Sequence, residues 1–299
     1  MEIIIKKYNN SYKEELRELI IQANGELSLL NLVEGNRSTS KGSFIALRKE
    51  KMIGLITSWK SIFHPYCTYF RCIALPEYLD CLDRLLAEME GSLSKGDYPL
   101  QISLDENSIL GNYFSRLNLK IIRKTYLPSL DLSVSSQGML PVALQRIKSL
   151  RELETRPDII TQLTKLVKRN YEETHFVNPV ADLTLDKWKE MIWAEDILLD
   201  GSYVYLNEKG DGILAYSFLH KSDQQGTVEL GWSGASDLSE IDILSILLEK
   251  QIYYSQLHGY RFLEGEFDTT SPYAMHMLKS KPFPREPVLI TFQKEKEND

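Results

Sequence analysis

The sequence contains two copies of one hairpin pattern, about half a chain apart. GSFIALRKEKMIGLITSWK begins at Gly42, and GSYVYLNEKGDGILAYSFL begins at Gly201. Each copy opens with Gly-Ser, an aromatic residue and a β-branched residue, and each returns to apolar residues after a charged turn. Two strand-like runs joined by a short polar turn predict an antiparallel pair of strands. The repeat constrains the whole chain, because it indicates one architecture that is built twice.

The segments around the two hairpins repeat in the same order, which is strand, helix, hairpin, strand, helix, strand, short helix and strand. Apolar residues at three- and four-residue spacing predict the helices, and runs of β-branched and aromatic residues predict the strands. The expected strands outside the hairpins are 2–8, 68–75, 99–104 and 120–127, then 142–150, 227–234, 260–267 and 287–294. The expected helices are 11–23, 82–89 and 108–117, then 157–173, 243–252 and 271–280, with a further helix around Trp188 and Trp193.

A chain of 299 residues exceeds the roughly 100–200 residues of one domain, so two domains are expected. The segment 133–141, SVSSQGMLP, is rich in Ser, Gly and Pro and is the natural boundary. We therefore expect an α/β protein of the mixed (α+β) kind with domains at 1–135 and 140–299. Each domain should be a twisted mixed β-sheet flanked by helices.

The charge is divided unevenly between the halves. Residues 1–139 carry a net charge of +1 and residues 140–299 carry −8, which together make the −7 of the whole chain. Nucleic-acid binding is not expected, because a basic surface for phosphates is missing. The acidic half would attract cationic amines, although an acidic surface with no ligand explains the same charge.

We expect a cytoplasmic protein, because its first apolar run, Ile3–Ile5, is too short for a signal peptide. No membrane span is expected either, because no stretch has the length of apolar sequence that a span needs. The cysteines Cys67, Cys72 and Cys81 are odd in number and are expected to be reduced thiols. No metal is expected, since no His lies near them at ligand spacing and the five histidines show no paired spacing.

The order of elements and the repeated hairpin together resemble the GNAT superfamily of N-acetyltransferases, and more specifically a tandem GNAT protein. The resemblance implies a sheet whose fourth and fifth strands splay apart, with acetyl-CoA in the gap and its pyrophosphate at the start of the next helix. The family signature there is Arg/Gln-x-x-Gly-x-Gly/Ala. Leu79, Leu82 and Arg84 stand at those places in the first half, and Ser239, Asp242 and Leu244 stand there in the second.

The resemblance places a cofactor-binding stretch at Trp232, Ser233, Gly234, Ala235 and Ser239 of the second half. Small residues at a strand end allow a ligand to approach the backbone, but they also occur in loops and bulges that bind nothing. Asp237, Glu240 and Asp242 would oppose a phosphate there. The first half offers less room and is expected to be degenerate.

The resemblance also implies a base and an acid for acetyl transfer. Glu229, in the middle of a predicted strand, matches the base, although it could simply point into water. The acid is usually a Tyr, which is absent at the matching position, Leu278, and Tyr273 is the candidate that replaces it. Glu264, Glu266 and Asp268 alternate along one strand and should share one face, which could bind a cationic amine or be solvated.

The expected function is N-acetyl transfer from acetyl-CoA to a cationic primary amine of a small molecule, a lysine or an N-terminus, by a monomer or homodimer. Two alternatives stay open. One is a binding module whose cofactor loops are both degenerate. The other is an aminoacyl transferase of the peptidoglycan-bridge type, against which the low positive charge argues.

Overall fold

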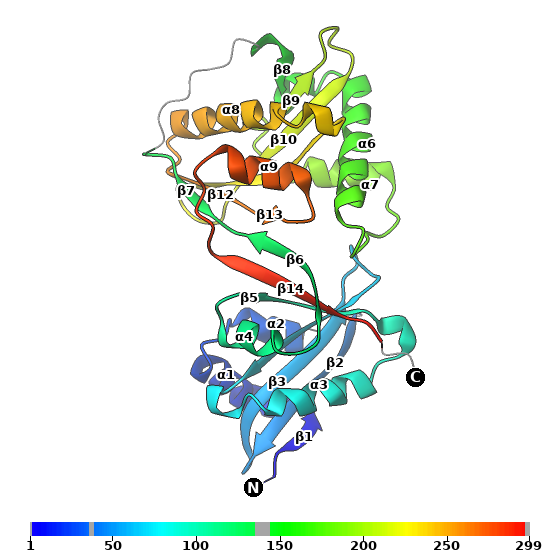
Figure 1. The fold of residues 1–299 in the computed structure, drawn as a ribbon, viewed down its shortest axis with the longest axis vertical. Helices are drawn as coiled ribbons and strands as arrows, with labels where there is room; N and C mark the ends of the chain where they lie inside the picture. The colour runs from blue at the N-terminus through cyan, green and yellow to red at the C-terminus, as the bar shows by residue number, and fades with distance from the viewer. Residues whose placement is uncertain (1, 36–38, 135–143, 297–299) are drawn as a thin grey trace. The chain divides into compact units, whose positions relative to one another are not determined.

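The computed structural model describes residues 2–35, 39–134 and 144–296. The chain forms two compact units, and the segments that build them are interleaved along the sequence (Figure 1). The first unit comprises Met1–Ile122, Val177–Ala181 and Ile290–Asp299, and the second comprises Arg123–Phe176 and Asp182–Leu289. The expected domain boundary lies within 135–143, which is outside the described residues.

Helices and strands follow the predicted order in both halves. The first half contains β1 (Ile4–Lys7), α1 (Lys13–Gln22), α2 (Ser28–Glu34), β2 (Ser40–Arg48), β3 (Lys51–Lys60), β4 (Thr68–Ala74), α3 (Cys81–Gly91), β5 (Leu100–Asp105), α4 (Ile109–Phe114), β6 (Lys120–Tyr126) and β7 (Ser129–Asp131). The second contains β8 (Ile147–Ser149), α5 (Leu150–Leu153), α6 (Pro157–Thr174), α7 (Leu185–Ile192), β9 (Tyr203–Leu206), β10 (Ile213–Lys221), β11 (Thr227–Ala235), α8 (Ile243–Leu257), β12 (Phe262–Gly265), β13 (Phe267–Asp268), α9 (Pro272–Ser280) and β14 (Val288–Lys294).

The strands form two mixed sheets, as expected for this fold class. The order in the first sheet is β1-β2-β3-β4-β5-β14-β6-β13, and the order in the second is β7-β12-β11-β10-β9-β8. The last strand of the chain, β14, therefore lies between β5 and β6 of the first sheet, and β7 from the first half of the sequence forms an edge of the second. Each sheet therefore includes at least one strand from a distant part of the chain.

Both repeated hairpins are present. In the first, β2 and β3 are joined by Lys49 and Glu50, which both have positive φ values of 51° and 66°. A two-residue turn with both residues in the left-handed region suits the right-handed twist of paired strands. The second hairpin is β9–β10, with a longer turn in which Gly210 has φ +71°.

Two predicted strands differ from the structure. The segment 142–150 is predicted to be one strand, and its first two residues lie outside the described part of the chain. Of residues 144–150, Ile147–Ser149 pair as β8, after a short 3₁₀ turn at Leu144–Arg146. The segment 260–267 is also not one strand. It breaks at Glu266, because β12 pairs with β11 and β7 while β13 pairs with β6.

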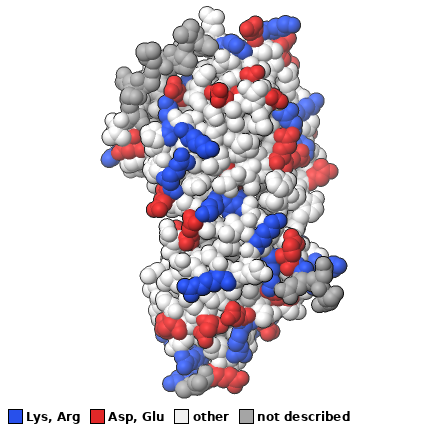
Figure 2. All heavy atoms as spheres, in the orientation of Figure 1, with Lys and Arg blue, Asp and Glu red and all other residues white. Residues whose placement is uncertain are grey.

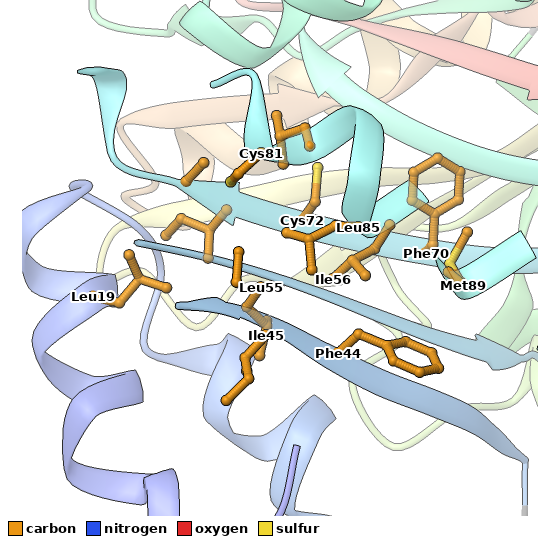
Figure 3. Close-up of a cluster of buried hydrophobic side chains, with 14 of the residues drawn as sticks. Leu19, Phe44, Ile45, Leu55, Ile56, Phe70, Cys72, Cys81, Leu85 and Met89 are labelled. Carbon is orange, nitrogen blue, oxygen red and sulfur yellow. The ribbon is translucent and has the colours of Figure 1, made fainter. Parts of the chain in front are cut away.

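Each unit has its own apolar core. In the first, leucine, isoleucine and phenylalanine side chains of β2–β4 meet α1 and α3 (Figure 3). Cys72 and Cys81 lie inside this core, where burial raises the pKa of both thiols to about 12. Such thiols are inert apolar groups rather than nucleophiles. Cys67, Cys72 and Cys81 are all buried, and none of them forms a disulfide.

A short segment between α6 and α7, Val177–Ala181, packs in the first unit. Its Asn178 is buried, and its side-chain amide nitrogen donates to the Tyr69 hydroxyl at 2.7 Å. The Cys67 thiol donates to the side-chain oxygen Oδ1 of Asn178 at 3.2 Å, and Nδ1 of His64 lies 2.9 Å from the backbone carbonyl oxygen of Asn178. Hydrogen bonds to the loop before β4 and to β4 itself therefore hold this segment in place.

Asp97 of the first unit is a buried carboxylate with several partners. Burial alone would raise its pKa, but hydrogen bonds from Lys41 and from the Ser94 side chain and backbone outweigh burial and lower the pKa to about 2. The Lys41 Nζ lies 2.6 Å from the Asp97 carboxylate. Asp97 therefore stabilises the fold when it is charged.

We predict that Asp97→Asn removes a pH-dependent part of the stability. The native pKa lies below the ordinary 3.8, so the contribution is complete above about pH 3.8 and disappears as the pH falls through about 2. Above pH 4 the variant should lose about 1–3 kcal/mol in the free energy of unfolding, and the difference from wild type should shrink at pH 2. Urea unfolding at several pH values measures it. A constant difference across that range would contradict the prediction.

On the face shown in Figure 2, Lys/Arg and Asp/Glu residues are interspersed. Among the described residues, none of the helices is both long and apolar enough to cross a bilayer. Residues 2–35, 39–134 and 144–296 also contain no group of three or more His, Cys, Asp or Glu side chains that could hold a metal ion.

Candidate active site

Two neighbouring strands of the second sheet, β11 and β12, separate partway along their length. β11 pairs in parallel with β12 only from Thr227 to Leu230. The chain then leaves β12 at Gly265, whereas β11 continues to Ala235. Residues 231–235 therefore extend beyond the β12 pairing, with β10 on their other side. A strand edge of this kind is able to bind an extended ligand through backbone hydrogen bonds.

A β-bulge interrupts β11 where it leaves β12. Gly231 and Trp232 of β11 together lie opposite the single residue Phe218 of β10. A Cβ atom on Gly231 would lie 2.5 Å from both Cδ2 and Nε2 of His220, so the imidazole ring lies against the backbone of the bulge. Glycine permits this close approach, and bulges of this kind often redirect side chains beside active sites.

Three ionisable residues lie in register across the sheet next to the bulge. His220 of β10 is opposite Glu229 of β11, and Glu229 is opposite Glu264 of β12. Residues paired in this way project from the same face. Glu229, the predicted base, is exposed, and its Oε1 accepts a hydrogen bond from the Ser222 hydroxyl at 2.5 Å. Its catalytic role stays a prediction.

The predicted substrate-binding carboxylates alternate in exposure, but they do not lie along one strand, because the chain breaks at Glu266 between β12 and β13. Glu264, Glu266 and Asp268 are partly or fully exposed, while the residues between them are buried. Although Glu266 is an exposed residue, desolvation raises the pKa of its carboxyl group, and the charges of Asp268 and Glu229 raise it further against the opposing effect of Arg123. Glu266 and Glu229 therefore contribute to one negative region.

Asp268 is already paired within the second unit. It accepts hydrogen bonds from the Thr125 hydroxyl and from Arg123, whose Nη1 lies 3.1 Å from Oδ2. Both side chains of this ion pair are largely buried. Asp268 therefore fixes β13 to β6, which leaves Glu264 and Glu266 better placed than Asp268 to meet a substrate.

Trp232, a predicted cofactor-binding residue, belongs to an aromatic cluster formed by Tyr171, His175, Trp188 and Trp232. Its ring centroid lies 5.2 Å from Tyr171 and 5.7 Å from Trp188. Tyr171 also stacks on His175 at 3.8 Å. The cluster joins α6 and α7 to the bulge of β11 and forms an apolar wall beside it. The predicted core position of Trp188 agrees with its full burial.

Two tyrosines lie near the end of β11. Tyr273, the predicted acid, is buried at the start of α9, and desolvation raises its pKa, with Glu173 adding to the rise and Arg169 opposing it. The Tyr216 hydroxyl lies 2.8 Å from where a Cβ of Gly234 would be. Burial raises the pKa of Tyr216 as well. Both phenols therefore keep their protons at neutral pH.

The junction between β11 and α8 carries charges of both signs. Asp237 accepts a hydrogen bond from the backbone N–H of the exposed Ser239 at 2.9 Å, and Asp242 is also exposed. Arg169 of α6 donates to the carbonyl oxygens of Ala235 and Ser236 at 3.3 and 2.8 Å. The Arg169 guanidinium group therefore lies at the end of β11.

The equivalent place in the first unit is filled differently. β4 pairs with β5 only at Thr68 and Tyr69, so these strands separate too, but β3 and β4 keep one register without a bulge. Phe70 contacts Phe114 of α4, and the Tyr113 hydroxyl donates to Asp83 at the start of α3. Apolar side chains and a carboxylate thus occupy the region in which the second unit has glycines.

Four residues that sequence reasoning missed lie at this site. They are Arg169 and Tyr216 at the end of β11, and His220 and Asp196 at the bulge. The separation of 24 residues between Asp196 and His220 hides their contact in the sequence. The expected amphipathic pattern of α6 indicated which face is buried, but it did not indicate that Arg169 reaches the end of β11.

Comparison with known proteins yields no matching family model and no matching curated protein. Solved structures do match. A GCN5-related N-acetyltransferase from Sphaerobacter thermophilus aligns with a TM-score of 0.65 at 11% identity, covering 98% of this chain and 95% of that one. A tandem GNAT protein from the clavulanic acid biosynthesis pathway aligns with a TM-score of 0.58 at 10% identity, covering 100% of both chains.

An N-myristoyltransferase of Saccharomyces cerevisiae with bound myristoyl-CoA aligns with a TM-score of 0.50 at 10% identity, over 98% of this chain and 79% of the other. At these identities the likeness concerns the fold. The predicted tandem arrangement of two GNAT-like sheets is therefore confirmed.

Proposed function

We propose that this chain, whose fold is that of tandem GNAT proteins, transfers an acyl group from acyl-CoA to a primary amine in its second unit. The observation that carries the proposal is the divergence of β11 from β12 at a bulge. The divergence leaves a strand edge for an extended ligand, next to ionisable side chains on one face of the sheet. No such combination occurs among the described residues of the first unit.

The residues present fit an acyl-CoA arm at β11. The backbone of Trp232–Ala235 would hold the arm, since this part of β11 extends beyond its pairing with β12. Acyl-CoA, when bound, supplies an acyl carbon activated as a thioester. Arg169 and Ser239 would face the diphosphate, whose charge Asp237 opposes. Acetyl-CoA is the donor that we propose first.

Glu229, Glu264 and Glu266 suit a cationic amine on the acceptor side. Carboxylates on one face attract a positive charge, and a neutral acceptor would not benefit from them. Tyr273, whose hydroxyl stays protonated, is proposed as the proton donor to the leaving sulfur. The first unit is proposed to be structural.

The test uses the full chain with acetyl-CoA and a panel of primary amines, together with the matching alcohols. Release of free CoA thiol and the mass of the acylated amine report transfer. We expect transfer to cationic amines and none to the alcohols. Absence of acetyl-CoA binding in calorimetry would overturn the proposal.

We predict that Gly234→Ala weakens acetyl-CoA binding by tenfold or more. A Cβ there would lie 2.2 Å from Nδ2 of the buried Asn170 and 2.8 Å from the Tyr216 hydroxyl, so these buried side chains or the end of β11 must shift. Overpacking of this kind costs about 1–3 kcal/mol. Calorimetry measures the affinity. Gly91→Ala is the control, because a Cβ at Gly91 meets nothing within 4 Å. Equal affinities of the two variants would contradict the prediction.

A second candidate is a binding module without catalysis. The exposed Asp237 and Asp242 near the start of α8 favour it, because they oppose a diphosphate. The same experiment separates the candidates. A module would bind a ligand or partner without releasing CoA thiol from acetyl-CoA in the presence of any amine.

A further inference from the structure

His220 is held at the bulge by an acidic partner. Its Nδ1 lies 3.1 Å from Oδ2 of Asp196, and the imidazole is largely buried while the Asp196 carboxylate is more than half exposed. The N–H of Lys221 donates to the Asp196 carbonyl oxygen at 2.8 Å, and Ile197 forms an antiparallel bridge with His220. Backbone contacts therefore fix Asp196 beside β10.

The Asp196 contact decides which ring nitrogen of His220 can accept a proton. A neutral imidazole has one N–H donor and one acceptor nitrogen. Because Nδ1 faces a carboxylate, the proton resides on Nδ1, which leaves Nε2 as the acceptor. Nε2 is one of the two ring atoms that lie against Gly231, 2.5 Å from the ideal Cβ position. The acceptor nitrogen is therefore presented at the bulge, where β11 leaves β12.

We infer that His220 is the proton acceptor of the acyl transfer and that Asp196 positions its ring. This inference rests on the proposed function. The ammonium group of the acceptor gives one proton to His220 Nε2, and the neutral amine nitrogen then forms a bond to the acyl carbon. The bond from that carbon to sulfur breaks, and its electron pair leaves with sulfur. Tyr273 protonates the sulfur to give the free thiol, and the second proton lost by nitrogen replaces the one that Tyr273 gave up.

Glu229 has another task in this arrangement. It is exposed and hydrogen-bonded to Ser222, so its carboxylate attracts the ammonium group and orients it toward Nε2. The charged groups that face His220 are Asp196 from the preceding loop and Glu229 from β11, with Glu264 one strand further. All three are acidic, and together they stabilise the imidazolium that forms.

The test compares full-length wild type with His220→Gln, Asp196→Asn and Glu229→Gln, using acetyl-CoA and the best amine of the panel. His220→Gln should lower kcat/KM by about 10²–10⁴-fold and remove the fall in kcat/KM on the acid side of its pH profile. Asp196→Asn should lower kcat by a smaller factor. Glu229→Gln should raise KM for the amine and keep the acid-side fall. His258→Gln, at the exposed end of α8, is the control and should match wild type.

Added imidazole should restore activity to His220→Ala, which a structural histidine would not show. Thermal unfolding of each variant identifies any that fails to fold. If His220→Gln does not fold, the inference is tested by imidazole rescue of His220→Ala and by the kinetics of Asp196→Asn. The inference would be overturned if wild type transfers the acyl group and kcat/KM of His220→Gln stays within threefold of wild type. In that outcome the acid-side fall in kcat/KM would persist in His220→Gln and disappear in Glu229→Gln. Absence of transfer by wild type to every amine would instead reject the proposed function.

Discussion

Removal of residues 290–299 is expected to abolish the cooperative folding of the first unit. β14 lies inside the first sheet, between β5 and β6, and its Ile290 and Phe292 are buried in the core of that unit. Thr291 hydrogen-bonds to Ser103 of β5 at 2.9 Å. Burial of two large apolar side chains contributes about 1.5–3 kcal/mol each, and the lost strand pairing adds to a deficit that approaches the whole 5–15 kcal/mol stability of a domain.

Hydrogen exchange measured by mass spectrometry checks this prediction. Amides of β2, β3 and β4 should lose protection in the shortened chain, and Trp59, the one tryptophan of the first half, should show the fluorescence of an exposed indole. A chain that lacks only residues 297–299 is the control, because it keeps β14 whole. Wild-type protection of β2–β4 without residues 290–299 would show that the prediction is wrong.

Trp188→Ala is expected to lower the free energy of unfolding of the second unit by about 3–5 kcal/mol, which is typical of truncating a large buried aromatic residue. The Trp188 side chain has no exposed surface. Its ring contacts Tyr171 at 5.4 Å and Trp232 at 5.7 Å, and the Lys168 ammonium lies 5.9 Å from its centroid. Truncation leaves a cavity between α6, α7 and the bulge of β11.

Urea unfolding followed by far-UV circular dichroism measures this loss. Phe176→Ala is a matched control, since Phe176 lies near the same elements but is 69% exposed and should change stability by less than about 0.5 kcal/mol. A loss below about 1 kcal/mol for Trp188→Ala would contradict the account of the aromatic cluster, because a fully buried tryptophan cannot be removed at so small a cost.

Local patterns in the sequence predicted most of the elements. The two hairpins, the helices α6 and α8 and the strand β11 follow from apolar spacing and turn residues, which act over a few residues. The pairing of strands from distant parts of the chain does not follow from such patterns. Thr291 and Ser103 are 188 residues apart. The apolar pattern of β14 predicts a strand, but it does not specify the sheet to which that strand belongs. Its place inside the first sheet was therefore not predicted.

The site was predicted in part for the same reason. Alternation along a strand predicted that Glu264 and Glu266 share one face, but the strand ends at Gly265, so the pattern holds only for the exposure of these side chains. The ion pair of Asp268 with Arg123 was missed, because Arg123 lies 145 residues earlier. The contact between Asp196 and His220 was missed because it joins a loop to a strand, with no characteristic spacing. Patterns identify a face, whereas the pairing of side chains across elements requires the fold.

The position of β14 also sets the order in which the protein can fold during synthesis. Ribosomes produce about 5–20 residues per second, and domains generally fold as they emerge, beginning at the N-terminus. Here β5 cannot acquire its β14 neighbour until the chain has grown past the whole second unit. The edge of β5 that faces β14, with its backbone N–H and C=O groups, is thus unpaired for the tens of seconds in which the later residues are made. Completion of the first unit is the last step of folding, although its strands are the first to be synthesised.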